Sequence, residues 1–112
     1  MEISVRKEKN IVIVSVIGRM DAVTAPEFEK CLSELLPKGD KTFLVNLAGL
    51  EYISSAGLRS ILVIAKQSKA GQGEVIFSGL RGPVEEVFKI SGFHSILKIF
   101  DSEEAALSSH LI

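Results

Sequence analysis

Hydrophobic and polar positions follow two patterns along this chain, and these patterns predict strands and helices in alternation. Runs rich in β-branched and other apolar residues favour strands, which span residues 3–6, 11–17, 42–47, 74–77 and 96–100. Apolar residues spaced three and four apart favour helices near residues 25–36, 56–69, 83–92 and 105–111. A short polar segment predicts a hairpin between the first two strands, whereas helices join the later strands and predict parallel crossovers. We therefore expect a single α/β domain over residues 1–112, with a mixed, mostly parallel sheet of about five strands and about four helices.

Residues at the expected helix ends support these boundaries. Thr24 followed by Glu27 has the spacing of a capping box, in which each side chain bonds a backbone N–H of the other residue. Pro83 and Gly92 stand at the start and end of the third helix, where proline and glycine are favoured. Residues 48–54, which include Gly49, Glu51 and Ser54, are expected to form a polar loop before the second helix.

Two adjacent serines, Ser54 and Ser55, stand where the third strand gives way to the second helix. Serine is a preferred N-cap residue, so either of them is a candidate cap for this helix. The loop also leaves the carboxyl end of a strand predicted to be parallel, where open α/β sheets expose functional groups. The helix dipole and free backbone N–H groups favour an anion there, so a phosphorylated serine would be tolerated. Capping and modification are compatible interpretations.

The second helix has apolar residues on more than one side. Its expected core stripe consists of Leu58, Ile61, Leu62 and Ala65. Val63 and Ile64 fall on the other side, beside Arg59, Ser60 and Gln67. Another element of the fold could cover these two residues, or they could form a partner-binding face next to the serines.

Composition narrows the function. The chain has 112 residues and a formal net charge of -1, which argues against nucleic acid as a partner. It has no apolar run of the roughly 18 residues that a membrane span requires, and its start lacks a secretory signal, so we expect a cytoplasmic protein without a membrane partner. One cysteine and two widely separated histidines predict no disulfide and no metal site, and nothing suggests a cofactor.

The short chain leaves little room for a pocket with several convergent polar groups. Ser55 also lacks the Gly-x-Ser-x-Gly elbow of a hydrolase. These features favour a monomeric binding or switching module over an enzyme.

Several short motifs follow one another along the chain: Gly-Arg-Met-Asp at 18–21, Thr-Ala-Pro-Glu-Phe at 24–28, Leu-Val-Asn-Leu at 44–47 and Tyr-Ile-Ser-Ser-Ala-Gly-Leu at 52–58. Their order and spacing resemble the STAS domain family, and within it the bacterial anti-sigma factor antagonists. The first two motifs resemble the family's junction between a strand and the first helix, and the last two resemble its signature strand, loop and helix start. Residues 84–88, 91–93, 99–100 and 103–105 resemble its C-terminal half, so the resemblance covers essentially the whole chain.

The resemblance implies a phosphorylation-controlled switch. The unphosphorylated protein would bind an anti-sigma factor that is also a serine kinase of the GHKL type, and so release a sigma factor. ATP-dependent phosphorylation of one serine would break this complex, and a PP2C-type phosphatase would restore it. By position the phosphoacceptor is Ser55. Ser54, which stands where the family often has an aspartate, is the alternative acceptor.

The expected partner surface combines the serine loop, the outer face of the second helix and two polar residues that match the family pattern. It comprises Asp21, Asn46, Ser54, Ala56, Gly57, Arg59, Ser60, Val63 and Gln67. Two other functions stay open. One is an unphosphorylated STAS scaffold, such as the small cytosolic subunit of a lipid or anion transport system. The other is a nucleotide-sensing module or minor enzyme that uses the Ser55 loop as an anion site.

Overall fold

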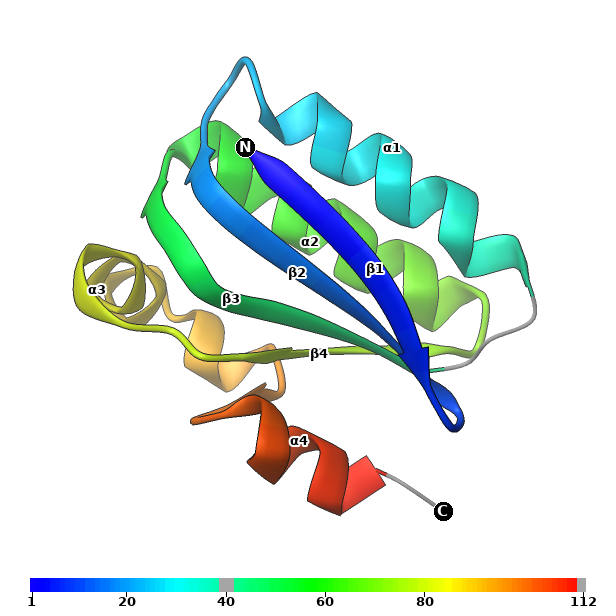
Figure 1. Ribbon diagram of the computed structural model, residues 1–112. Helices are drawn as coiled ribbons and strands as arrows, with labels where there is room; N and C mark the ends of the chain where they lie inside the picture. Colours follow the sequence, from blue (N-terminus) through cyan, green and yellow to red (C-terminus); the bar gives the residue numbers. More distant parts are fainter. Residues whose placement is uncertain (39–41, 111–112) are drawn as a thin grey trace.

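The computed structural model describes residues 1–38 and 42–110, and in these residues one five-stranded sheet carries helices on both of its faces (Figure 1). The strands lie side by side in the order in which they occur along the chain. The elements are β1 (Glu2–Glu8), β2 (Ile11–Met20), α1 (Ala25–Leu35), the 3-10 turn Leu36–Lys38, β3 (Thr42–Ile53), α2 (Ser55–Ala70), β4 (Glu74–Ser78), α3 (Gly82–Ile90), the 3-10 turn Phe93–Ser95, β5 (Ile99–Phe100) and α4 (Glu103–His110).

The sheet is mixed, as the sequence predicts. β1 and β2 form an antiparallel hairpin in which Glu2 lies opposite Ile17 and Glu8 lies opposite Ile11. The remaining strands lie parallel to their neighbours, in the order β2, β3, β4 and β5, and crossover connections that contain helices join them. The expected α/β fold with a mostly parallel sheet is therefore confirmed.

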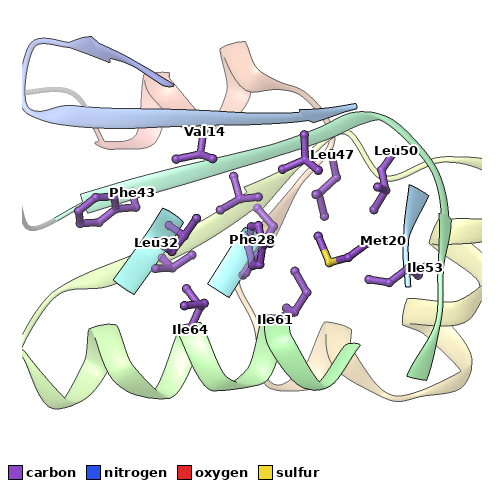
Figure 2. Packing of buried hydrophobic residues seen from close by; sticks show 14 of the residues in the cluster. Val14, Met20, Phe28, Leu32, Phe43, Leu47, Leu50, Ile53, Ile61 and Ile64 are labelled. Atoms are coloured by element: carbon purple, nitrogen blue, oxygen red, sulfur yellow. The ribbon is translucent and has the colours of Figure 1, made fainter. Parts of the chain in front are cut away.

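Alternation along the central strands creates two apolar layers. Val12, Val14 and Val16 of β2 face a large core that Phe28 of α1 and Ile61 of α2 complete (Figure 2). The intervening residues of the strands lie on the other side of the sheet, where α4 covers a smaller apolar cluster. This cluster consists of Ile11, Ile13, Leu44, Ile76 and, from α4 itself, Ala106. The side of the sheet on which a side chain lies thus decides whether it can reach α2 or α4.

β2 and β3 are longer than expected, and residues 48–53 are strand rather than loop. Leu50 and Ile53 are buried at 3% and 4% exposure, whereas Glu51 and Tyr52 between them are exposed. Two irregularities in the register of β2 against β3 break the strict alternation that a strand prediction relies on. Gly49 permits this pairing, because a Cβ at that position would lie 2.8 Å from the Ile17 side chain.

Other boundaries also differ from the sequence prediction. Thr24 stands at the N-cap of α1, but its side chain caps no N–H group of the helix. Its hydroxyl group donates a hydrogen bond to the Arg19 carbonyl oxygen at 2.9 Å instead. The predicted capping box is therefore wrong. β5 is only Ile99–Phe100, because the backbone N–H groups of residues 96 and 97 both bond the Phe93 carbonyl and continue a helical turn. The expected end of the last helix near residue 111 lies outside the described residues.

Candidate functional site

The carboxyl ends of β2 and β3 meet at one edge of the sheet, where α2 begins. Ser54 is the N-cap of α2, and its hydroxyl oxygen accepts a hydrogen bond from the Gly57 N–H at 3.2 Å. The Ser54 backbone N–H donates to the Met20 carbonyl at 2.9 Å, and this bond joins the serine loop to the end of β2. The interpretation of Ser54 as a helix cap is confirmed.

Ser55 is the first residue of α2 and is exposed. No hydrogen bond holds its hydroxyl group anywhere in the part of the chain that the structure describes. No histidine or carboxylate there contacts it as a general base would, so nothing in the described residues activates it as a nucleophile. The two serines therefore differ: Ser54 maintains the fold, and Ser55 presents a free hydroxyl to solvent.

Gly57 has a packing role in this junction. It is buried, and a Cβ at this position would lie 2.7 Å from the Ile53 side chain and 2.9 Å from the Met20 carbonyl oxygen. The second contact is with backbone, so only glycine lets α2 pack this closely against the end of β2. Gly57 thus sets the position of the start of α2 and has no side chain that a partner could contact.

Asp21 lies directly after β2, in the loop that the Met20–Ser54 bond holds beside the start of α2. Its carboxylate oxygen accepts hydrogen bonds from the backbone N–H groups of Val23 at 3.0 Å and Thr24 at 3.1 Å. The bond from the Thr24 N–H is the main cause that lowers the pKa of Asp21 below its usual 3.8. Asp21 thus fixes the shape of a loop next to Ser55.

The outward face of α2 carries Arg59, which is exposed, and Val63, which is 39% exposed. The prediction that Ser60 lies on this face is wrong, since Ser60 is 1% exposed. Ile64 is 0% exposed, so of its two alternatives the cover by another element is the one confirmed. α1 packs alongside α2 and widens its buried side, so the buried stripe runs through Gly57, Ser60, Ile61, Ile64 and Ser68. The predicted core residues Leu58, Leu62 and Ala65 are only partly buried.

Hydrogen bonds between α1 and α2 involve two residues expected on the partner surface. The Ser60 hydroxyl donates to the carboxylate of Glu29. The Ser33 hydroxyl donates to the Gln67 side-chain oxygen at 3.1 Å, in a more exposed position. Ser60 is thus part of the helix–helix contact, and Gln67 stands at its outer margin.

Asn46 is not part of this edge of the sheet. Its side-chain amide donates to Glu103 of α4 at 2.9 Å, and its oxygen accepts from the Ala48 N–H at 2.9 Å. Arg6 of β1 also bonds Glu103. Burial raises the pKa of Glu103, but the bonds from Asn46 and Arg6 outweigh that effect and lower it overall. Asn46 therefore fastens α4 to the sheet face opposite α2.

Two comparisons identify the family. The STAS domain model matches residues 2–106. The chain is 38% identical over 109 residues to BtrV of Bordetella bronchiseptica, which is named as an anti-sigma factor antagonist; the match covers 97% of this chain and 94% of that one. The chain belongs to the STAS domain family.

Solved structures of other bacterial proteins share the fold. A protein of Thermotoga maritima that is described as an anti-sigma factor antagonist has a TM-score of 0.88, with 24% identity over 96% of this chain and 92% of that one. SpoIIAA of Bacillus, in its phosphorylated form, has a TM-score of 0.73, with 19% identity over 97% of this chain and all (100%) of that one. At these identities the likeness concerns the fold.

The structure of this STAS domain adds three exposed residues to those that the sequence suggested for this edge. Val23, two residues after Asp21, is 83% exposed. Arg19 lies over the ring of Tyr52, with 4.2 Å between the guanidinium carbon and the ring centre. A valine in a loop of small and polar residues is a signal that sequence analysis could have used. The Arg19–Tyr52 pair required the register of β2 against β3, where they lie opposite each other.

Two further observations bear on what this STAS domain can bind. Among residues 1–38 and 42–110, no group of three or more His, Cys, Asp and Glu side chains is arranged to hold a metal ion. No helix in those residues is both long enough and apolar enough to cross a membrane. This edge presents an exposed serine hydroxyl, two arginines, a tyrosine and exposed valines, and arginine and aromatic side chains are enriched in protein-binding surfaces.

Proposed function

We propose that this STAS domain is an anti-sigma factor antagonist: unphosphorylated, it binds an anti-sigma factor that is also a serine kinase, and it thereby releases a sigma factor. The observation that carries the proposal is the free, exposed hydroxyl of Ser55 at the start of α2. The name of the Bordetella relative, which aligns over nearly the whole of both chains, supports the same role. In this proposal the protein works in the cytoplasm as a regulator and performs no catalysis of its own.

The geometry favours Ser55 over Ser54 as the phosphoacceptor. The Ser54 hydroxyl accepts the bond from the Gly57 N–H that caps α2, and Ser54 is only partly exposed. A phosphate on Ser54 would crowd that cap, whereas Ser55 can be modified without the loss of any hydrogen bond in the described residues. A kinase bound to this edge of the sheet could reach the Ser55 oxygen directly.

The modification is a phosphoryl transfer from ATP. The Ser55 oxygen forms a bond to the γ-phosphorus, and the bond from that phosphorus to the oxygen shared with the β-phosphate breaks. ADP leaves, and the hydroxyl proton passes to a base on the kinase. A PP2C-type phosphatase would reverse the modification by hydrolysis, which returns the serine and releases inorganic phosphate.

The surface that would bind the kinase extends along α2 and the loop that carries Asp21. α2 contains no aspartate or glutamate, and its three cations are Arg59, Lys66 and Lys69. Together with the exposed side chain of Val63, these cations suit a partner surface that is acidic and partly apolar. A phosphate on Ser55 adds about -1.5 to -2 charges at neutral pH, which would repel such a partner and would resist desolvation in the interface.

Incubation with a candidate anti-sigma serine kinase and ATP, followed by intact-mass measurement and fragment mapping, tests the proposal. We expect a single phosphate on Ser55 that the Ser55→Ala variant does not acquire. The Ser54→Ala variant is the matched control: it should lose about 1 kcal/mol of stability with its cap and still be phosphorylated. Modification of Ser54 alone would overturn the site assignment.

A binding measurement separates the switch from the scaffold alternative. By calorimetry, the unphosphorylated protein should bind the kinase, and the protein phosphorylated on Ser55 should not. If no candidate kinase binds or modifies the protein, the antagonist function is wrong and a scaffold role in a transport system becomes the better hypothesis.

A further inference from the structure

Arg59 stands one helical turn after Ser55, on the same face of α2. Residues four apart on a helix have Cβ atoms about 5–6 Å from each other, close enough for an ion pair. Both Ser55 and Arg59 are exposed, so neither side chain has to leave the core to reach the other. The spacing alone therefore puts a guanidinium group within reach of any phosphate on Ser55.

The Arg59 side chain is also available. Within residues 1–38 and 42–110 it forms no ion pair and no hydrogen bond, and α2 itself contains no carboxylate that could compete for it. Other cations nearby are differently placed. Arg19 already lies over the Tyr52 ring, and Lys66 is about three turns from the start of the helix.

We propose that Arg59 clamps the phosphate of phosphorylated Ser55. The inference rests on the proposed function, since it takes Ser55 as the phosphoacceptor. A guanidinium group presents its N–H donors in a planar fork that matches phosphate oxygens, and the pair lies at the positive end of the helix dipole. The phosphate would thus gain a partner within its own chain.

The clamp gives phosphorylation a second effect on the partner surface. An unpaired Arg59 presents a positive charge to the anti-sigma factor. When Arg59 turns toward the phosphate, that charge is neutralised at the same moment that negative charge appears on Ser55. Phosphorylation therefore withdraws one attractive contact and adds a repulsive group, without any change of fold.

The test uses phosphoserine placed at position 55 during translation, so it needs no kinase. Phosphorus NMR then follows the second ionisation of the phosphate, which has a pKa of about 6 for an unpaired phosphoserine. A nearby cation favours the dianion and lowers this pKa. We expect Arg59→Gln to raise the phosphate pKa by about 0.3 unit relative to the otherwise native protein.

Matched variants define the outcome. Lys66→Gln removes the same charge from the same helix and should leave the phosphate pKa unchanged. Arg59→Lys keeps the charge without the planar fork and should give an intermediate value. Arg19→Gln and Asp21→Asn test the other charged groups at this edge of the sheet. The proposal is overturned if Arg59→Gln leaves the pKa unchanged, or if Arg19→Gln or Lys66→Gln raises it equally.

This result is independent of the kinase assay. If Arg59 does not pair with the phosphate, but a kinase phosphorylates Ser55 and then dissociates from the phosphorylated protein, the proposed function stands. The switch then acts through the phosphate charge alone. If the clamp is present but no kinase modifies Ser55, the antagonist function fails while the pairing of Arg59 with a phosphate at this position stands.

Discussion

Replacement of Ser60 by alanine distinguishes a residue that holds α1 against α2 from one that contacts a partner. Ser60 is 1% exposed, and its hydroxyl donates to the half-buried carboxylate of Glu29. A hydrogen bond to a charged group contributes about 1.5–3 kcal/mol, and water can partly replace the lost donor at Glu29, so the lower value applies. Alanine recovers about 0.5 kcal/mol through its higher helix propensity. We expect a net loss of about 1 kcal/mol.

Thermal and urea unfolding measure this loss. With an unfolding entropy of about 2.1 cal/mol/K per residue, the midpoint should fall by about 4 °C for a chain of 112 residues. Ser33→Ala is the control, because Ser33 joins the same two helices through its bond to Gln67 but in an exposed position. We expect Ser33→Ala to change the free energy of unfolding by less than about 0.5 kcal/mol.

A double-mutant cycle with Glu29→Ala, which removes the acceptor oxygen, isolates the bond itself. If Ser60→Ala is as stable as the native protein, or costs as much in the Glu29→Ala background as it does with Glu29 in place, the hydrogen bond contributes nothing and the reasoning is refuted. The affinity of the folded Ser60→Ala protein for its partner should be unchanged. A loss of affinity at full stability would return Ser60 to the binding surface.

Three further predictions concern other residues of the expected partner surface. Val63→Glu should weaken partner binding, measured by calorimetry, while the melting temperature stays nearly constant. Ile64→Ala should lower the free energy of unfolding by about 2–5 kcal/mol, because Ile64 is 0% exposed. An equal loss of stability in the two variants would contradict the faces of α2 to which these residues are assigned. Because folding lowers the pKa of Asp21, its ionised form stabilises the protein above pH 3.8, and this contribution is lost as the pH falls through the lowered pKa. Asp21→Asn, which keeps the acceptor oxygen, should therefore lose less stability than the native protein in urea titrations across that acidic range, and an identical pH dependence would refute this role. Asn46→Ala should speed hydrogen exchange at the start of α4, where Asn46 bonds Glu103, and leave partner affinity unchanged; reduced affinity without faster exchange would instead place Asn46 in the interface.

The sequence predicted those parts of the fold that depend on local pattern. β-branched runs and helical spacing gave the order of elements, and serine at a helix start gave the cap of α2. It could not predict that β3 continues through Glu51 and Tyr52, because a register shift against β2 interrupts the alternation there. The sequence left open whether another element covers Ile64, because a single helix pattern does not reveal that α1 covers a second side of α2.

The residues of the candidate site were likewise predictable from the sequence only in part. Ser54 and Ser55 are adjacent in the chain, and only the hydrogen bond to the Gly57 N–H shows which of them the fold uses. Asn46 matched the family pattern in sequence, but its contact with Glu103 depends on strand alternation that points it toward α4. Contacts between distant segments, such as that of Arg19 with Tyr52, depend on strand register and therefore become visible only in the folded protein.

Under the proposed function, the different roles of Ser54 and Ser55 would let a small domain carry a reversible switch. The cap of α2 and the packing of Gly57 hold the helix start through groups that a phosphate on Ser55 does not touch. In the proposed switch, the free energy of phosphorylation would therefore not be used for unfolding and would act on the complex with the partner. Like charges across an interface cost several kcal/mol, and each 1.4 kcal/mol changes an affinity tenfold, so one phosphate on Ser55 would be sufficient to dissociate a moderately tight complex. If the acceptor were the capping serine, part of that effect would be lost to helix fraying.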